Sequence, residues 1–197
     1  MDSAANESST AAFCVRAATP ADIPELMRLK RLLAEGENSL HAVRASAADW
    51  LRDGFGPAAG FCAFVAEAPG AAGSATTGNS IIGNPIIGMA ICSRRVITGW
   101  NGPVIFLQDL FVEPAHRRHG VARALAARIA AYARELGSPI VELTVRADND
   151  AQVFYRNNGF ALLPQCLTYV LAGPALAALA ERDRELPGGK DSLALAG

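Results

Sequence analysis

The chain lacks the features that mark several classes of protein. No apolar run reaches the roughly 18 residues that a membrane-spanning helix needs, so we expect no membrane partner. Lys and Arg number 18 against 19 Asp and Glu, a formal charge of −1, and without a basic excess we expect no nucleic-acid partner. The first dozen residues carry Asp2 and Glu7 and no apolar stretch, which predicts no secretory signal and a cytoplasmic location.

Signatures of metal and nucleotide binding are also missing. Cys14, Cys62, Cys92 and Cys166 are widely spaced and form no CxxC pair, and the three histidines lack metal-ligand spacing. We therefore expect no metal, and we interpret the cysteines as small buried thiols that stay reduced. Neither a Walker loop nor a GxGxxG fingerprint occurs.

The chain does contain enough apolar material for one sizeable core, since 51 % of its 197 residues are hydrophobic. Small and polar residues predict a disordered tail over 1–11 and a loop over 69–80. We expect one domain over 12–173. The remaining residues, 174–197, are expected to form an extension that is partly helical and then flexible.

The pattern of apolar residues predicts an α+β fold. The stretches 86–92 and 104–112 flank a Gly/Pro turn and are predicted to form an antiparallel hairpin. One strand–helix–strand crossover follows, which favours a mixed, mainly antiparallel sheet flanked by helices. The expected strands are 13–16, 62–67, 86–92, 104–112, 140–145, 160–163 and 167–171, and the expected helices are 20–33, 48–53, 121–136, 151–157 and 175–184.

The segment 107–123 carries the clearest chemical signal. A strand ends there, a short basic turn follows, and a helix begins at Gly120. Backbone N–H groups at a helix start are unpaired and lie at the positive end of the helix dipole. Gly120 lets an anion approach the backbone, and Arg117, Arg118 and Arg123 can add charge-assisted bonds to phosphate.

Two segments share motifs with a known family. Residues 117–122, Arg-Arg-His-Gly-Val-Ala, match the acyl-CoA loop pattern Q/R-x-x-G-x-G/A. Residues 151–160 carry, in register, the Ala, Phe-Tyr and Gly-Phe of the pattern N-x-x-A-x-x-F-Y-x-x-x-G-F. Asp148 stands where Asn is usual, and Asn149 lies one place later. On these segments the chain resembles the GNAT superfamily of N-acetyltransferases.

Shorter stretches extend the resemblance over most of the chain. Residues 16–22, 51–56, 65–67 and 106–112 are similar to the diamine acetyltransferases, the spermidine/spermine and thialysine N-acetyltransferases. The resemblance implies an acetyl-CoA-dependent enzyme that acetylates a primary amine of a small molecule (a polyamine, thialysine or a related amine) by direct attack. It also implies a homodimer, for which the edge strand expected at 167–171 is a candidate pairing element.

The resemblance implies where acetyl-CoA binds. The central strands splay, the pantetheine arm lies along 110–112, and the N–H of Phe111 or Val112 polarises the thioester carbonyl. Tyr155 matches the residue expected to protonate the CoA sulfur. The implied cofactor-binding residues are Leu110, Phe111, Val112, Arg117, Arg118, His119, Gly120, Val121, Ala122, Arg123 and Asn149.

An amine of pKa about 10 must lose a proton before it attacks a carbonyl carbon. Asp109 is the first candidate to hold the ammonium or accept its proton through water, and Glu113 is the second. Gln108 and Glu37 are candidate substrate-binding residues. Gln108 stands where the diamine enzymes usually have Glu, and Leu32 where they have an acidic residue. A substrate with one amine and some apolar or carboxylate character is therefore as compatible with the sequence as spermidine.

Two other functions stay open. A protein or peptide amine acetyltransferase would have an open groove, whereas a small-amine enzyme would have a closed acidic pocket. A non-catalytic CoA-binding sensor would keep the arginine-rich loop without needing Tyr155 or Asp109. Both residues are present, which favours an enzyme.

Overall fold

The computed structural model describes residues 13–69, 84–99 and 102–184 of the chain. The tail expected at 1–11, the loop expected at 69–80 beyond Pro69, and the flexible end expected from residue 187 lie outside the described residues. The chain divides into two compact units, Met1–Asn149 and Asp150–Gly197, and each is described by itself.

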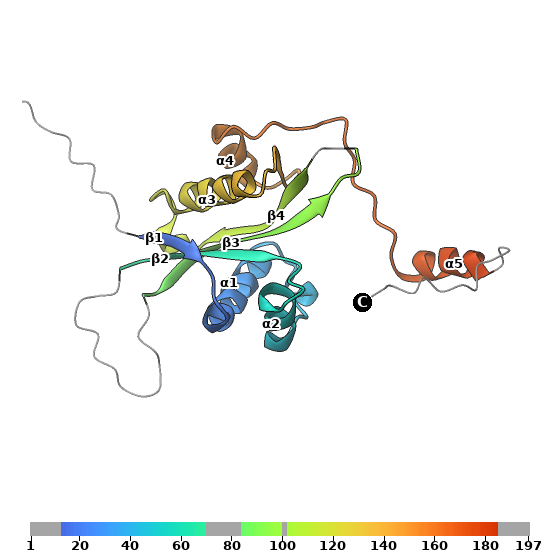
Figure 1. Cartoon of the computed structure of the whole chain (residues 1–197), viewed down its shortest axis with the longest axis horizontal. Coiled ribbons are helices and arrows are strands. Elements are labelled where there is room, and N and C mark those ends of the chain that lie inside the picture. Colours follow the sequence, from blue (N-terminus) through green and yellow to red (C-terminus); the bar gives the residue numbers. More distant parts are fainter. Residues whose placement is uncertain (1–12, 70–83, 100–101, 185–197) are drawn as a thin grey trace, which may run out of the picture. The chain divides into compact units, whose positions relative to one another are not determined.

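The first unit is built on a five-stranded sheet (Figure 1). Neighbouring strands follow chain order, and each neighbouring pair is antiparallel except β4 and β5, which are parallel. The strands are β1 Cys14–Ala17, β2 Cys62–Glu67, β3 Ile86–Val96, β4 Pro103–Val112 and β5 Val141–Glu142. The helices are α1 Ile23–Gly36, α2 Ala47–Phe55 and α3 Val121–Glu135, with 3₁₀ turns at Pro20–Asp22, Leu40–Ala42 and Pro114–His116. This confirms the predicted mixed, mainly antiparallel sheet with flanking helices.

Asp22 fixes the start of the first helix. Its carboxylate accepts hydrogen bonds from the Thr19 N–H (2.7 Å) and hydroxyl (2.9 Å), and from Arg16 Nη1 (2.7 Å). The Arg16 guanidinium, helped by these Thr19 donors, lowers the pKa of Asp22 to about 2. The residues Thr-Pro-Ala-Asp at 19–22 predict a capping contact between Thr19 and Asp22, which the structure confirms. Pro20–Asp22 nevertheless form a 3₁₀ turn, and α1 itself begins at Ile23.

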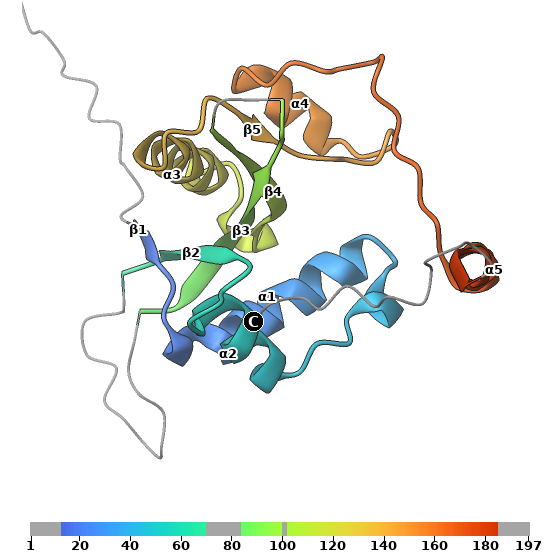
Figure 2. The same ribbon diagram turned by 45° about the vertical axis from the view of Figure 1, so that its right-hand side comes forward.

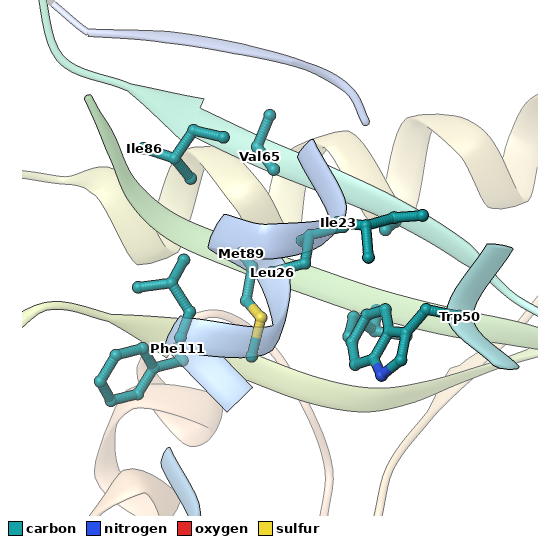
Figure 3. Packing of buried hydrophobic residues seen from close by; sticks show 10 residues of the cluster. Ile23, Leu26, Trp50, Val65, Ile86, Met89 and Phe111 are labelled. Atoms are coloured by element: carbon teal, nitrogen blue, oxygen red, sulfur yellow. The ribbon is translucent and has the colours of Figure 1, made fainter. Parts of the chain in front are cut away.

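Successive side chains of β2 pack on the two opposite faces of the sheet, both of which are buried. On one face Val65 joins Leu26 of α1 and Trp50 of α2 in a single apolar cluster (Figure 3). On the other face Phe64 meets Tyr132 of α3, with ring centroids 5.5 Å apart. Because successive strand side chains point in opposite directions, the sheet lies between a layer of α1 and α2 and a layer of α3 (Figure 2).

Gly88 of β3 lets the layers come close near the end of β4. A Cβ at this position would lie 3.0 Å from the Phe111 carbonyl oxygen and 3.3 Å from side-chain atoms of Leu125 and Val112. Because Gly88 has no side chain, α3 packs directly against the part of the sheet where β3 and β4 pair.

β4 changes its pairing along its length. A register shift against β3 makes Gln108 an extra residue, a β-bulge. On the other side, β5 pairs with β4 only at Ile105 and Phe106. From residue 108 to 112, no strand of the described residues lies along this second edge of β4. β5 is the edge strand of the described sheet, so what the structure shows in place of the expected splay of central strands is an unpaired stretch of β4.

Two predicted strands are wrong. Residues 160–163 and 167–171 form no strand, and β5 spans Val141–Glu142 in place of 140–145. Apolar and β-branched runs become strands only when a neighbour supplies backbone hydrogen bonds. Within the described residues no strand pairs with 160–171, and β4 pairs with β5 at only two positions. The edge strand expected at 167–171 is therefore absent from the single chain.

The second unit contains α4 Ala151–Asn157 and α5 Gly173–Arg184, close to the helices predicted over 151–157 and 175–184. A turn around Gly159, with φ +86°, ends α4, and there the Phe160 N–H donates to the Tyr155 carbonyl (3.1 Å). The Tyr155 ring meets Phe154 and Phe160 edge-on, with centroid distances of 5.4 and 5.5 Å. Both ring contacts lie within the second unit.

The prediction of buried cysteines holds for only part of the set. Cys92 is fully buried, and burial raises the pKa of its thiol to about 12. Cys62 is partly buried, whereas Cys14 and Cys166 are exposed. All four are free thiols.

Candidate active site

Backbone N–H groups alternate in direction along β4. The Glu113 N–H, just past the strand, donates to the Ile87 carbonyl of the β3 side (3.0 Å). The N–H of Phe111, two residues earlier, therefore also faces β3, and those of Leu110 and Val112 face the opposite edge. That edge has no partner strand in the described residues at this point. Of the two amides expected to polarise a carbonyl, those of Phe111 and Val112, only the Val112 amide faces the unpaired edge. The Leu110 amide, which was not among the two, faces the same edge.

The N-terminus of α3 presents a second set of backbone donors. Gly120 is the residue before the helix, with φ +83°, and a Cβ there would meet nothing within 4 Å. The N–H groups of the first helical turn have no intrahelical acceptor, and that turn holds no acidic side chain. Val121 anchors the turn in the core, and Ala122 adds little bulk beside it. The exposed basic residues nearby in sequence are Arg117, Arg118, His119 and Arg123.

Arg117 behaves differently from the other arginines of this loop. Its Nε donates to the Val112 carbonyl (3.0 Å), and its guanidinium carbon lies 5.7 Å from the centroid of the Phe111 ring. It therefore ties the loop before α3 to the end of β4. The sequence predicted a phosphate contact for Arg117 but not this link.

A cavity of about 220 Å³ lies beside β4. Gln108 and Asp109 both line it, so the structure brings these two predicted residues together. Trp50 and Phe61 also line it, with their rings in edge contact at 5.5 Å. Asp109 directly precedes Leu110, the first residue past the bulge whose N–H faces the unpaired edge. Its carboxylate is largely buried, with 13 % of the side chain exposed.

Both candidate bases form ion pairs with α1. Lys30 Nζ lies 2.6 Å from Asp109 Oδ1, and Arg28 Nη1 lies 2.6 Å from Glu113 Oε1. The helical spacing of Leu26, Lys30 and Leu33 predicts that the Lys30 stem lies on the apolar face of α1, but it does not identify Asp109 as the partner. The sequence does place a cation four residues after the buried Leu26, on the same helix face. A charge at such a core-facing position indicates that a counter-ion packs against it.

Two candidate residues of the first unit, Glu37 and Asn149, are not among the residues that line this cavity. Glu37 is exposed just after α1. Asn149 is partly buried in the turn after β5, where its N–H donates to the Arg146 carbonyl (3.1 Å). Tyr155 belongs to the second unit, and its contacts with Phe154 and Phe160 are internal to that unit.

Two kinds of feature are not found in the described part of the chain. No group of three or more His, Cys, Asp or Glu side chains among residues 13–69, 84–99 and 102–184 could hold a metal ion. No helix in the same ranges is long and apolar enough to cross a membrane.

The backbone donors fit an extended ligand with an anionic end. The amides of Leu110 and Val112 can bind an amide-containing arm that adds to the β4 edge, as a peptide strand would. The α3 N-terminus, with Gly120 leaving open space, can bind phosphate oxygens. The Asp109 carboxylate lies on the face of β4 that packs against α1, where it can bind a cationic group. This arrangement can bring an acyl group carried by such a ligand to an amine.

Comparison with known proteins identifies the family. Residues 39–160 match the model of the acetyltransferase (GNAT) family. The chain is 30 % identical over 153 residues to spermidine/spermine N(1)-acetyltransferase-like protein 1 of Homo sapiens, a match that spans 76 % of this chain and 20 % of that longer protein. It is 29 % identical over 176 residues to the thialysine N-epsilon-acetyltransferase of Mus musculus, spanning 85 % of this chain and 97 % of that one.

Solved structures agree with the fold. An aminoglycoside N-acetyltransferase in complex with CoA is similar at a TM-score of 0.60 and 21 % identity, over 81 % of this chain and 94 % of that one. The family model spans more than half of the chain and includes β4, the basic loop and α3. The chain therefore belongs to the GNAT family and is an acetyl-CoA-dependent N-acetyltransferase.

Proposed function

We propose that this enzyme acetylates a primary amine of a small molecule, a polyamine, thialysine or a related amine, by direct attack. The observation that carries the proposal is the position of Asp109. Its carboxylate lies in a small cavity, and the next residue turns its N–H to the unpaired edge of β4. The names of the human and mouse relatives, spermidine/spermine and thialysine acetyltransferase, support the substrate class.

The residues proposed to bind acetyl-CoA all belong to the first unit. The N–H groups at Gly120, Val121 and Ala122 donate to the pyrophosphate, and the backbone of 110–112 holds the pantetheine arm. Arg118, His119 and Arg123 add charge, Arg117 supports the end of β4, and Asn149 is a candidate amide contact. When bound, acetyl-CoA supplies an activated acetyl thioester.

The register of β4 supports a specific amide as the group that polarises the acetyl carbonyl. Phe111 directs its N–H into the sheet, so we assign this task to the outward amides. Leu110 adjoins Asp109, whereas the Val112 N–H lies about 7 Å further along the strand at about 3.3 Å per residue. We assign the Leu110 N–H to the acetyl carbonyl and the Val112 N–H to the pantetheine arm.

Asp109 and Tyr155 move the protons in this proposal. An alkylammonium of pKa about 10 is protonated near neutral pH. Asp109 binds the ammonium in exchange for Lys30 and accepts its proton through water. The amine nitrogen then forms the new C–N bond as the C–S bond breaks, and the Tyr155 hydroxyl donates a proton to the leaving sulfur. The nitrogen loses its second proton to water, and Tyr155 regains a proton from water.

The cavity volume supports a small acceptor. At about 220 Å³, the space beside Asp109 fits a short aliphatic amine better than a folded protein surface. The test is release of free thiol from acetyl-CoA in the presence of diamines, lysine analogues, aminoglycosides and peptides. Turnover with small amines is expected. Turnover with peptides alone would establish the protein acetyltransferase instead, and no transfer to any amine would point to a CoA-binding sensor.

The proposal also covers the domain bounds, the location and the partners of the enzyme. We propose a catalytic domain over 12–173 with an extension over 174–197, and the family match at 39–160 supports the central part of that domain. We further propose a cytoplasmic homodimer without nucleic-acid or membrane partners. The similarity to small-amine acetyltransferases supports a role among small metabolites.

A further inference from the structure

Each carboxylate that lines the Asp109 cavity already faces a cation of the protein. Lys30 Nζ lies 2.6 Å from Asp109 Oδ1. Arg52 holds the other two, with 2.8 Å from Nη1 to Asp49 Oδ1 and 2.6 Å from Nε to Asp53 Oδ1. An ammonium that enters the cavity therefore either displaces one of these cations or shares its carboxylate, and in both cases the cavity gains a positive charge.

Lys30 is the cation that such an exchange would leave in the cavity. Its side chain is 32 % exposed, whereas that of Arg52 is 66 % exposed and can turn to water. Lys30 lies one helical turn after the fully buried Leu26, so its stem is held on the sheet-facing side of α1. Once a substrate ammonium occupies Asp109, the Lys30 ammonium needs a new counter-ion, because a half-buried charge without a partner is unfavourable.

The substrate itself can supply that counter-ion. We infer that Lys30 is a specificity-determining residue and that the preferred acceptor is an amino-carboxylate, with its ammonium on Asp109 and its carboxylate on Lys30. This inference rests on the proposed function. Trp50, Phe61 and Ile91 also line the cavity and cover the carbon chain between the two charged ends. A diamine presents a second cation to Lys30 and is disfavoured by like-charge repulsion.

The test compares substrates of equal chain length and variants that differ in one charge. The substrates are three series of equal chain length: ω-amino acids, n-alkylamines and α,ω-diamines, each assayed with acetyl-CoA by thiol release. The variants are Lys30→Met, which removes the charge and keeps an unbranched chain, and Lys30→Arg, which keeps the charge. Arg31→Met is the control, because it removes a neighbouring exposed cation from the same helix.

The expected order of kcat/KM for the wild type is amino acid, then alkylamine, then diamine. Lys30→Met is expected to lower the ratio of amino acid to diamine by about tenfold or more. Lys30→Arg and Arg31→Met are expected to keep the wild-type order.

Two results overturn the inference while the proposed function stands: a wild type that prefers diamines, or a folded Lys30→Met variant with an unchanged ratio. The first comparison needs no variant, so it decides the matter even if Lys30→Met does not fold. Failure of the wild type to acetylate any of the three series, while it still binds acetyl-CoA, would overturn the proposed function itself.

Discussion

Charged side chains in the first unit act as pairs, and each pair determines what its members contribute. The Arg16–Asp22 pair closes the start of α1, and the Lys30–Asp109 pair borders the candidate active site. Removing one member of a largely buried pair costs more than the pair itself stabilises. Arg16 keeps Glu67 as a second acidic partner when Asp22 is replaced, so the loss there is that of the Asp22 contacts. Substitutions in the Arg16–Asp22 pair are therefore expected to change the free energy of unfolding. Substitutions in the Lys30–Asp109 pair are expected to change which substrate is preferred.

Asp22 is expected to make unfolding depend on pH in the acid range. Its pKa is lowered from 3.8 to about 2, chiefly by Arg16, so folding favours the ionised form. That stabilisation is present above about pH 4 and is lost as the pH falls through about 2. Asp22→Asn should lower the free energy of unfolding at pH 7 by about 2 kcal/mol and flatten its decline between pH 4 and 2. Urea unfolding at several pH values measures both effects.

The control for this experiment is Glu135→Gln. Glu135 pairs with Arg128 on α3, but its side chain is 57 % exposed, so the change should alter stability little. An Asp22→Asn variant with the acid dependence of the wild type would contradict the role assigned to the Arg16–Asp22 pair.

Tyr155→Phe is expected to lower kcat by about a hundredfold and to leave acetyl-CoA affinity unchanged. The change removes only the hydroxyl proposed to protonate the leaving sulfur, a contribution typical of general acids. The ring contacts with Phe154 and Phe160 remain. Steady-state kinetics and calorimetric titration measure the two quantities, and Tyr169→Phe, at an exposed tyrosine of the same unit, is the control. Unchanged kcat would remove Tyr155 from the mechanism.

Single residues were predictable where their role follows from local sequence, and less so where it depends on packing. Thr19 with Asp22 and Gly120 at the start of α3 are examples of the first kind, since caps and turns involve near neighbours. The partner of Asp109 is an example of the second kind. Lys30 lies 79 positions away, and only the packing of α1 on the sheet brings it there.

Among the elements, the helices were predicted closely, and the strands were predicted closely only where a neighbouring strand pairs with them along most of their length. Apolar residues at helical spacing define the buried face of α3 without reference to other elements, as Val121, Leu125 and Ile129 show. Strand formation depends on a partner, which is why 160–163 and 167–171 were predicted wrongly. The edge of β4 is unpaired for the same reason: β5 pairs with β4 at only two positions, so the rest of that edge has no partner strand in the described residues.

Gly120→Val tests the role of the α3 N-terminus. The backbone at this position has φ +83°, which a β-branched residue adopts only with strain, so the first turn is expected to shift. Acetyl-CoA affinity should fall by about tenfold or more, as the phosphate-binding amides move and a side chain enters the space above them. Calorimetric titration gives the affinity.

Gly137→Val is the matched control at the other end of the same helix. Gly137 has φ +69° and likewise open space around a Cβ, so the strain introduced is similar. Both variants are expected to show a lower Tm, but only Gly120→Val should weaken acetyl-CoA binding. Equal loss of affinity in both would mean that strain in α3, rather than the phosphate-binding turn, controls binding.

At the scale of the whole molecule, the first unit has a well-formed core, whereas the second exposes much apolar surface. Leu162, Leu167 and Val170 are all exposed, and Tyr169 is 88 % exposed. Contiguous apolar exposure of this kind is typical of surfaces that bind another chain. It coincides with the apolar segment that was predicted to form strands and that finds no partner strand within the described residues.

We therefore expect the proposed homodimer to be formed through residues 160–171, with the partner chain supplying the hydrogen bonds that a strand needs. Light scattering after gel filtration should give twice the 20.6 kDa mass of the chain. Replacing Leu167 and Val170 together by Glu should give a single-chain mass, because two charges would enter the apolar interface. Leu51→Glu, at an exposed apolar position on α2, should leave the mass unchanged. A wild type of single-chain mass at micromolar concentration would contradict the dimer, and a dimeric double variant would assign it to another surface.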